Sequence, residues 1–394
     1  MERDETKAIG EQALGDRRFE KAITDGKLGG IEAAVSFYKE NTTPQLIVFE
    51  TDLSGDTLLE QVARLAEVCD EGTEVLALGS ANDVQTYRSL VSEGVNDYIV
   101  GPFNAVQIFN AIEAVVIDPD APPRGRVIAF VGAKGGTGSS TLAHNVTWSL
   151  AQLYEDDVIL LDLDLAFGTA GMTFNVDPQQ GIYDALEQPD RLDDVLLKRY
   201  MAEPIVNIKL LSAPVTLETD ADIDIKSLDS LLEMVRRTAP FIVLDIPHHW
   251  SGWAKHALMQ ADEIVLTSTL DLISLRDTKN LVDLLESKRA NDAPLRLVIN
   301  QQGAYRKTEL SEKDFETAVG GTAALVIAHD PVLFGTAANN GQVIGALKPK
   351  DKVVEGFNEL AKLVSNMELP KGKKKGDGEA KPGLFSFLKK KEKG

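Results

Sequence analysis

The sequence contains a single cysteine, Cys69, and no apolar run approaching the roughly 18 residues that a membrane-spanning helix needs. A lone cysteine excludes an intramolecular disulfide bond and favours a reducing compartment. The first residues, beginning Met1-Glu2-Arg3, are charged and lack the apolar core of a secretory signal. These absences together predict a cytoplasmic protein.

Positive charge is also scarce over most of the chain. The 394 residues include 61 acidic and 41 basic side chains, for a net charge of −20. The exception is the segment 371–394, where nine lysines face three acidic residues. An acidic body disfavours wrapping the phosphates of a nucleic acid. The hydrophobic fraction of 43% is ordinary for a globular protein, and the length allows two or three domains.

A glycine-rich loop follows the apolar run at residues 127–131 and precedes a helical pattern at residues 142–153. In a strand, loop and helix of this kind, backbone N–H groups and the positive end of the helix converge on a phosphate. The alternative is a glycine turn that binds nothing. We predict a phosphate site formed by Gly135, Gly136, Thr137, Gly138, Ser139, Ser140 and Thr141.

The loop departs from the strict P-loop pattern at two positions. Ala133 replaces the first glycine, and Ser139 replaces the lysine that reaches the β- and γ-phosphates. Ser140 keeps the hydroxyl that binds magnesium, and a lysine, Lys134, stands at the front of the loop. This arrangement resembles the deviant Walker A motif of the MinD/ParA ATPases. The resemblance implies that Lys134 crosses a dimer interface to the partner's nucleotide and takes part in catalysis.

Carboxylates follow two apolar segments that read as strands. Asp162 and Asp164 end the segment 158–163, and Asp245 ends another strand-like run. An ATP-dependent switch needs such groups to hold magnesium and water. The positions resemble switch I and Walker B of the MinD/ParA family, which implies that Asp162 and Asp245 join Ser140 around Mg²⁺. The same resemblance implies that Asp164 orients the attacking water; each aspartate alone could equally be a cap or turn residue.

Asn300 follows the predicted strand at residues 295–299. It occupies the position of the base-recognising asparagine in the MinD/ParA family, so the resemblance implies that its amide binds adenine. The alternative is an asparagine that only closes a strand end. The family resemblance covers residues 126–363.

Helical and strand-like segments alternate between residues 31 and 116, which predicts a parallel sheet covered on both faces. This region resembles response-regulator receiver domains at residues 46–50, 94–98 and 101–103. Glu50, however, stands at the phosphoacceptor position, and Gly101 stands where a receiver has its lysine. We therefore predict a pseudo-receiver that docks or dimerises, although another small flavodoxin-like domain fits almost as well.

The predicted fold class is α/β, with a receiver-like (flavodoxin-like) domain followed by a P-loop, MinD/ParA-like domain with a mostly parallel sheet. The predicted divisions are a flexible N-terminus at 1–18, the pseudo-receiver at 19–116, a linker at 117–125, the ATPase domain at 126–367 and a basic tail at 368–394. Within 1–18, the alanine and glutamate content allows a short helix. The strands expected in the ATPase domain span 126–131, 158–163, 208–211, 241–246, 263–267, 295–299 and 323–327.

The tail ends in apolar residues followed by lysines. A short amphipathic helix there could bury its apolar side in an anionic membrane surface, at the inner membrane or a cell pole. A solvated basic end is an equal alternative. The apolar positions are Leu384, Phe385, Phe387 and Leu388.

Four features together resemble the CpaE/TadZ group, which localises the machinery that builds Flp/Tad pili. They are Ser139, the Leu142-Ala143-His144-Asn145 helix start, the His248-His249-Trp250 sequence after the predicted Walker B strand, and the fused pseudo-receiver. We interpret the two histidines as part of a packed switch II, since adjacent residues do not readily bind one metal ion.

The resemblance implies ATP and Mg²⁺ as cofactors, a homodimer, and partners among the pilus secretion ATPase and inner-membrane platform proteins. Hydrolysis should be slow or absent, because the missing lysine would offset charge in the transition state. A ParA-type DNA-segregating ATPase and a nucleotide-independent scaffold with a vestigial site are the alternatives. A tyrosine kinase of the same lineage is disfavoured, since the last tyrosine is Tyr305.

Overall fold

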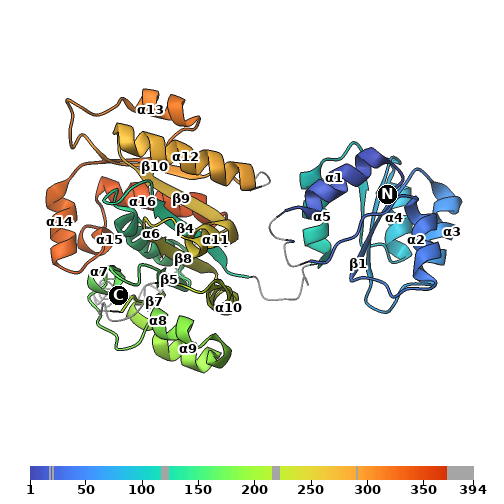
Figure 1. Cartoon of the computed structure of the whole chain (residues 1–394), viewed down its shortest axis with the longest axis horizontal. Helices are drawn as coiled ribbons and strands as arrows, with labels where there is room; N and C mark the ends of the chain where they lie inside the picture. Colours follow the sequence, from blue (N-terminus) through green and yellow to red (C-terminus); the bar gives the residue numbers. More distant parts are fainter. Residues whose placement is uncertain (17–18, 20–21, 117–123, 215–221, 290–291, 371–394) are drawn as a thin grey trace, which may run out of the picture.

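The computed structural model describes residues 1–16, 19, 22–116, 124–214, 222–289 and 292–370. The chain folds around two separate sheets, one formed before residue 117 and the other after residue 125 (Figure 1).

The first sheet has three parallel strands in the order β1-β2-β3. Its strands alternate with helices, as the sequence predicts. The elements are α1 (Asp4–Leu14), α2 (Gly30–Tyr38), β1 (Leu46–Thr51), α3 (Gly55–Ala66), β2 (Glu74–Gly79), α4 (Val84–Ser92), β3 (Asp97–Val100) and α5 (Ala105–Val116).

Helices cover both faces of this sheet. The core on one face contains Ile31 of α2, Leu58 of α3 and Leu90 of α4. The core on the other face contains Ala13 of α1 and Ile108 of α5. A flavodoxin-like sheet has five strands, and the described residues here supply three. The receiver-like assignment therefore stays a prediction, as do the domain boundaries.

The expectation of a flexible segment at residues 1–18 is wrong for its central part. Asp4–Leu14 forms α1, which packs against α5 and buries Ala13 completely. Ile9 and Leu14 also pack against this core. The helix is mostly polar, so its narrow apolar face is recognised only from its packing against α5.

The second sheet has eight strands in the order β11-β10-β9-β4-β8-β5-β7-β6. All neighbouring pairs are parallel except β6 and β7 at one edge. The mostly parallel sheet is confirmed. Strand β6 was not predicted, because its sequence contains a proline, which argues against a strand. The strands are β4 (Arg126–Gly132), β5 (Val158–Asp162), β6 (Ala202–Ile205), β7 (Ile208–Leu211), β8 (Phe241–Ile246), β9 (Glu263–Ser268), β10 (Arg296–Gln302) and β11 (Leu325–Ala328).

Two apolar cores sandwich this sheet (Figure 1). One face carries α6 (Ser139–Tyr154), α14 (Pro331–Asn339), α15 (Ile344–Leu347) and α16 (Lys352–Ser365). The other carries α8 (Ile182–Glu187), α9 (Asp194–Tyr200), α10 (Ile225–Val235), α11 (Gly252–Gln260), α12 (Leu272–Lys288) and α13 (Glu312–Val319). Short α7 (Ala170–Thr173) and the 3₁₀ helix η2 (Pro189–Arg191) lie in the connections.

Two features of this domain position its site. Strand β4 lies between β8 and β9, so the loop that follows it emerges at the middle of the carboxyl edge of the sheet. Helix α6 packs along α16, and the Tyr154 hydroxyl at its end lies 2.5 Å from the Ser365 hydroxyl. The central loop therefore leads into a helix that is anchored at its far end.

Candidate functional site

The glycine loop connects β4 to α6, as the sequence predicts. Its last residue, Gly138, has a φ of +87° and is the N-cap of α6, where no side chain accepts from the first helical N–H groups. Such an uncapped helix start leaves N–H donors and the positive end of the helix dipole for an anion. The geometry therefore suits a phosphate.

Ser139 is the first residue of α6 and is 9% exposed. Its buried hydroxyl has no hydrogen-bond partner in the part of the chain that the structure describes. Leaving a buried hydroxyl unpaired costs about 1–3 kcal/mol. A phosphate oxygen at the helix start would accept from this hydroxyl, so the residue fits an anion even though it carries no charge.

Lys134 forms an ion pair within its own chain. Its Nζ lies 2.7 Å from Oδ2 of Asp271, the N-cap of α12. Burial alone would raise the pKa of Asp271, but hydrogen bonds from Lys134, Ser274 and Thr269 hold that pKa well below its usual range. The contact across a dimer interface stays a prediction, and Lys134 would have to leave Asp271 to make it.

Asp162 is the last residue of β5 and Asp245 is the last but one of the neighbouring β8, and the two are paired in register. Both are buried, at 0% and 2% exposed. Burial, and then repulsion from Asp245, raises the pKa of Asp162 to about 7, although His144 opposes the rise. The structure thus brings together the two carboxylates that the sequence places at strand ends.

A buried histidine, His144, also contacts Asp245, and no functional role was predicted for it from the sequence. Its Nε2 lies 3.2 Å from Oδ2 of Asp245, and its Nδ1 lies 3.1 Å from the Thr173 hydroxyl. The histidine is 1% exposed and projects from α6. The sequence signal was a polar residue within the buried stripe of a helix, but its partner lies about a hundred positions away.

The donor set fits a hard divalent cation. Oδ1 of Asp245 is buried and has no partner among the described residues, and buried charge needs a counter-charge. Carboxylate and hydroxyl oxygens, such as those of Asp162 and Ser140, are ligands that Mg²⁺ accepts alongside several waters. The described residues contain no cluster of three or more His, Cys, Asp or Glu arranged around one metal position. Phosphate oxygens and water would therefore complete the coordination.

Asp164 lies at the start of the next turn and is partly buried. Its Oδ1 accepts from the Phe167 N–H at 3.0 Å, and its carbonyl accepts from the Gly168 N–H at 2.7 Å. These bonds hold the segment between β5 and α7. The role in orienting water stays a prediction.

Asn300 contacts the glycine loop. Its Nδ2 donates to the Thr137 carbonyl at 2.7 Å, and the neighbouring Gln301 Nε2 donates to the Gly136 carbonyl at 2.9 Å. Asn300 is 7% exposed. Binding of adenine by Asn300 stays a prediction, whereas the contact seen here is with the loop backbone.

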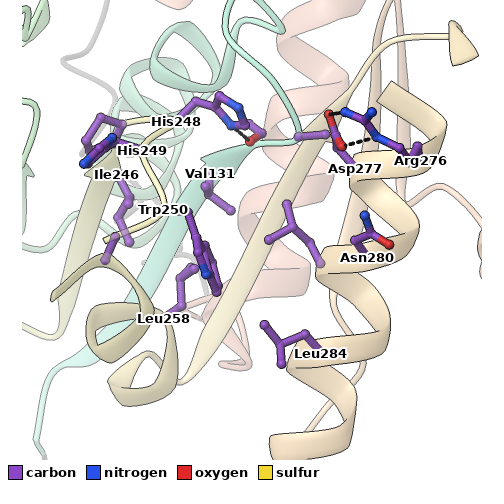
Figure 2. A pocket seen from close by; sticks show the side chains of 15 residues that line it. Val131, Ile246, His248, His249, Trp250, Leu258, Arg276, Asp277, Asn280 and Leu284 are labelled. Carbon is purple, nitrogen blue, oxygen red and sulfur yellow. Dashed lines mark hydrogen bonds and ion pairs between the residues drawn. The ribbon is translucent and has the colours of Figure 1, made fainter. Parts of the chain in front are cut away.

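The segment after β8 differs from the packed switch II that the sequence suggested. His248, His249 and Trp250 are exposed, because the chain leaves the sheet edge there before α11 begins. His248 Nδ1 lies 3.0 Å from the Gly132 carbonyl. Figure 2 shows these residues at a cavity of about 440 Å³, which also has apolar lining from α11 and α12.

That cavity lies beside the glycine loop, on the face of the sheet that carries α11 and α12. The Arg276 guanidinium pairs with Asp277 at its rim (Figure 2). Its lining includes Val131 and Ala133 but neither Ser139 nor Asp162. This cavity is therefore distinct from the predicted phosphate and magnesium positions.

Glu50, at the predicted acceptor position, is completely buried at the end of β1. Its carboxylate accepts from the Glu2 and Arg3 backbone N–H groups, the Arg3 guanidinium and the Thr6 hydroxyl. Burial alone would raise the pKa of Glu50, but these donors lower it overall. Hydrogen bonds from the first residues of the chain therefore satisfy the Glu50 carboxylate.

The predicted membrane contacts Leu384, Phe385, Phe387 and Leu388 lie outside the described residues. Among the helices that are described, none combines the length and apolar character of a membrane span.

The fold and site define a class. A glycine loop between a central parallel strand and an uncapped helix, with aspartates ending the neighbouring strands, is a P-loop domain. Residues 125–294 match the family model described as an AAA domain. The septum site-determining protein MinD of Bacillus subtilis is 23% identical over 261 residues, covering 62% of this chain and 91% of the relative.

Solved structures give the same result for the fold. MinD from Pyrococcus horikoshii, complexed with Mg-ADP, is 23% identical with a TM-score of 0.54 and covers 61% of this chain and 96% of its own. The second domain thus has the P-loop fold seen in this MinD structure. A pilus assembly protein CpaE from Caulobacter crescentus is 41% identical over 29% of this chain and 92% of its own, with a TM-score of 0.28.

Proposed function

We propose that this protein is a nucleotide-binding positional scaffold. It binds ATP with Mg²⁺ at the loop after β4, dimerises in the ATP-bound state, and positions the machinery that assembles Flp/Tad pili. Its hydrolysis of ATP is slow or absent. The observation that carries the proposal is the unpaired, buried Ser139 hydroxyl at an uncapped helix start, beside the paired Asp162 and Asp245.

The residues of the chain would divide the work. The first N–H groups of α6 and the Ser139 hydroxyl would bind phosphate oxygens. Ser140, Asp162 and Asp245 would hold Mg²⁺, which neutralises phosphate charge when bound. No side chain of α6 places a cation where the strict motif has its lysine, so the transition state would gain less stabilisation than the bound nucleotide.

The proposed cofactors and the proposed partners are supported by different observations. A relative with the same fold is complexed with Mg-ADP, which supports the nucleotide and metal. The pilus component, with a secretion ATPase and inner-membrane platform proteins as partners, is supported by the sequence features shared with the CpaE/TadZ group. Peripheral membrane contact through the basic tail belongs to the same proposal.

Calorimetry with ATP and with ADP in the presence of Mg²⁺, combined with light scattering on the same samples, tests the proposal. ATP should bind and shift the mass from monomer to dimer, and Lys134→Ala should weaken the shift. Lys279→Ala is the matched control, because Lys279 forms a surface ion pair with Asp283 away from the loop. Absence of binding at millimolar ATP, with an unchanged mass, would refute the nucleotide switch.

A nucleotide-independent scaffold is a second candidate. It is favoured by the ion pair between Lys134 and Asp271, which already occupies the lysine without any nucleotide. The same titration separates the two functions, because the scaffold would keep one oligomeric state at every nucleotide concentration. A DNA-segregating ATPase would instead bind DNA in a strongly salt-dependent manner.

A further inference from the structure

The end of strand β10 departs from regular geometry. Between Ile299 and Gln302 the pairing with β11 advances three residues on β10 but only two on β11. This one-residue excess is a β-bulge. Within it, Gln301 has a φ of +56°, a left-handed conformation that non-glycine residues seldom adopt.

The bulge has a consequence for side-chain direction. Successive side chains of a regular strand point to opposite faces of the sheet. Here the consecutive residues Asn300 and Gln301 both reach the glycine loop. Two neighbouring amides can therefore act on the same target only because the strand is irregular at this point.

The target is a pair of consecutive peptide groups. Asn300 Nδ2 donates to the Thr137 carbonyl at 2.7 Å, and Gln301 Nε2 donates to the Gly136 carbonyl at 2.9 Å. In a trans peptide the N–H points opposite to the carbonyl. The N–H groups of Thr137 and Gly138 are thus turned away from β10, and neither donates to an acceptor within the described residues.

Two further contacts fix this arrangement. The Gln301 N–H donates to Asn300 Oδ1 at 2.8 Å, which leaves the Asn300 Nδ2 facing the loop. A Cβ added to Gly138 would lie only 2.4 Å from that nitrogen. Asn300 consequently packs directly on the loop at a position that only glycine allows.

We propose that Asn300 and Gln301 are positioning residues that hold the glycine loop in its phosphate-binding conformation before a nucleotide arrives. The inference rests on the proposed nucleotide binding and assigns to Asn300 a role that does not depend on the base. The strained Gln301 backbone is consistent with this role, since such outliers concentrate at functional sites.

The test compares Asn300→Ala and Gln301→Gly with the wild-type protein, using ATP, GTP and inorganic tripolyphosphate as probes. Loss of one loop-holding hydrogen bond should weaken all three ligands by a similar factor of about tenfold. Binding of adenine by Asn300 predicts something different, namely a loss confined to the preference for ATP over GTP with tripolyphosphate unaffected. That pattern would overturn the proposal.

Gln301→Gly separates positioning from general stability. Glycine adopts a positive φ without steric cost, so the thermal unfolding midpoint should stay the same or rise while phosphate affinity falls. A purely structural role predicts that both decline together. Gln302→Met is the matched control, because Gln302 Nε2 donates to Glu312 and not to the loop.

Backbone order parameters from NMR relaxation of the nucleotide-free protein keep the inference independent of the proposed function. Both variants should lower the order parameters of the Thr137 and Gly138 amides, and the Gln302→Met control should not. If the wild-type protein binds no nucleotide, this measurement still decides the matter. Unchanged order parameters at these two amides in both variants would refute the positioning role.

Discussion

Lys134 Nζ donates to Asp271 Oδ2 across 2.7 Å and so joins the glycine loop to the first turn of α12 in one chain. Asp271 already accepts from the Ser274 N–H as a helix cap. The carboxylate that holds the lysine would therefore still cap α12 after the lysine leaves. Release of this ion pair is a step that any contact between Lys134 and a second chain must include.

Asp271→Asn should make that release easier. Asparagine keeps the cap of α12, whereas the charge that holds Lys134 disappears. We expect a larger dimer fraction at a given concentration of Mg-ATP, measured by light scattering. Asp277→Asn is the control, since Asp277 pairs with Arg276 on the same helix. A smaller dimer fraction in Asp271→Asn than in the control would contradict the expectation.

Ser139→Lys should raise the rate of ATP hydrolysis. The substitution places an ammonium at the first position of α6, where it would offset charge that develops on the phosphates. Removing or adding one such group changes turnover by about 10²-fold or more. Phosphate release should be compared with that of Ser139→Met, which adds similar length without charge. Equal turnover in the two variants would show that the position is not limiting.

Asp245→Asn should change the response to magnesium. Two neighbouring buried carboxylates repel each other, so removing one charge should stabilise the protein without metal. Ligand binding stabilises the native state by about 2.7 kcal/mol at a concentration of 100 times Kd. The wild-type unfolding temperature should therefore rise with Mg²⁺, and that of the variant should not.

Asp262→Asn controls for a general effect of removing a carboxylate, because Asp262 pairs with Arg236 at a separate position. Its response to magnesium should match that of the wild type. A magnesium response retained in Asp245→Asn would exclude this residue as a ligand.

Glu50→Gln should reduce the acid sensitivity of the N-terminal domain. The pKa of Glu50 is lower in the folded protein than its ordinary value of 4.5, because Thr6 and Arg3 donate to the carboxylate. Its stabilising contribution is therefore complete above about pH 4.5 and is lost as the pH falls through the lower folded value. Unfolding followed between pH 3 and 7 should show a weaker pH dependence in the variant, with lower stability at pH 7.

Glu32→Gln serves as the comparison, since Glu32 lies on the same sheet's α2 and, among the described residues, accepts one long hydrogen bond, from Gln61 Nε2 at 3.3 Å. Its acid unfolding should follow the wild type. Identical pH profiles for Glu50→Gln and the wild type would argue against a stabilising role for the buried carboxylate.

The sequence was informative where local pattern decides the structure. Strand β8 and its Asp245 were predicted because the signal, an apolar run followed by a carboxylate, lies in consecutive residues. The loop before Ser139 was predicted for the same reason. Strand β6 was missed, since a short proline-containing strand reveals itself only by its neighbours. For α1 the sequence allowed a short helix but did not show that the helix packs against the rest of the domain.

The contacts that complete the site were not predictable, because each joins distant positions. His144 meets Asp245 across the sheet edge, and Gln301 meets the loop only through a bulge. The hydrophobic pattern of the sequence does not indicate where a strand will contain a β-bulge. The pairing of Lys134 with its own chain was likewise hidden by the family resemblance, which implied a different partner.

The hydroxyl contact between Tyr154 and Ser365 fixes the end of α6 that lies far from the glycine loop. Helix α6 is 16 residues long, or about 24 Å, and its first turn borders the phosphate position. Its last residue is tied to the end of α16, just before the chain continues toward its basic end. The helix therefore spans the distance between the phosphate position and the point where the chain leaves α16, with a fixed contact at its far end.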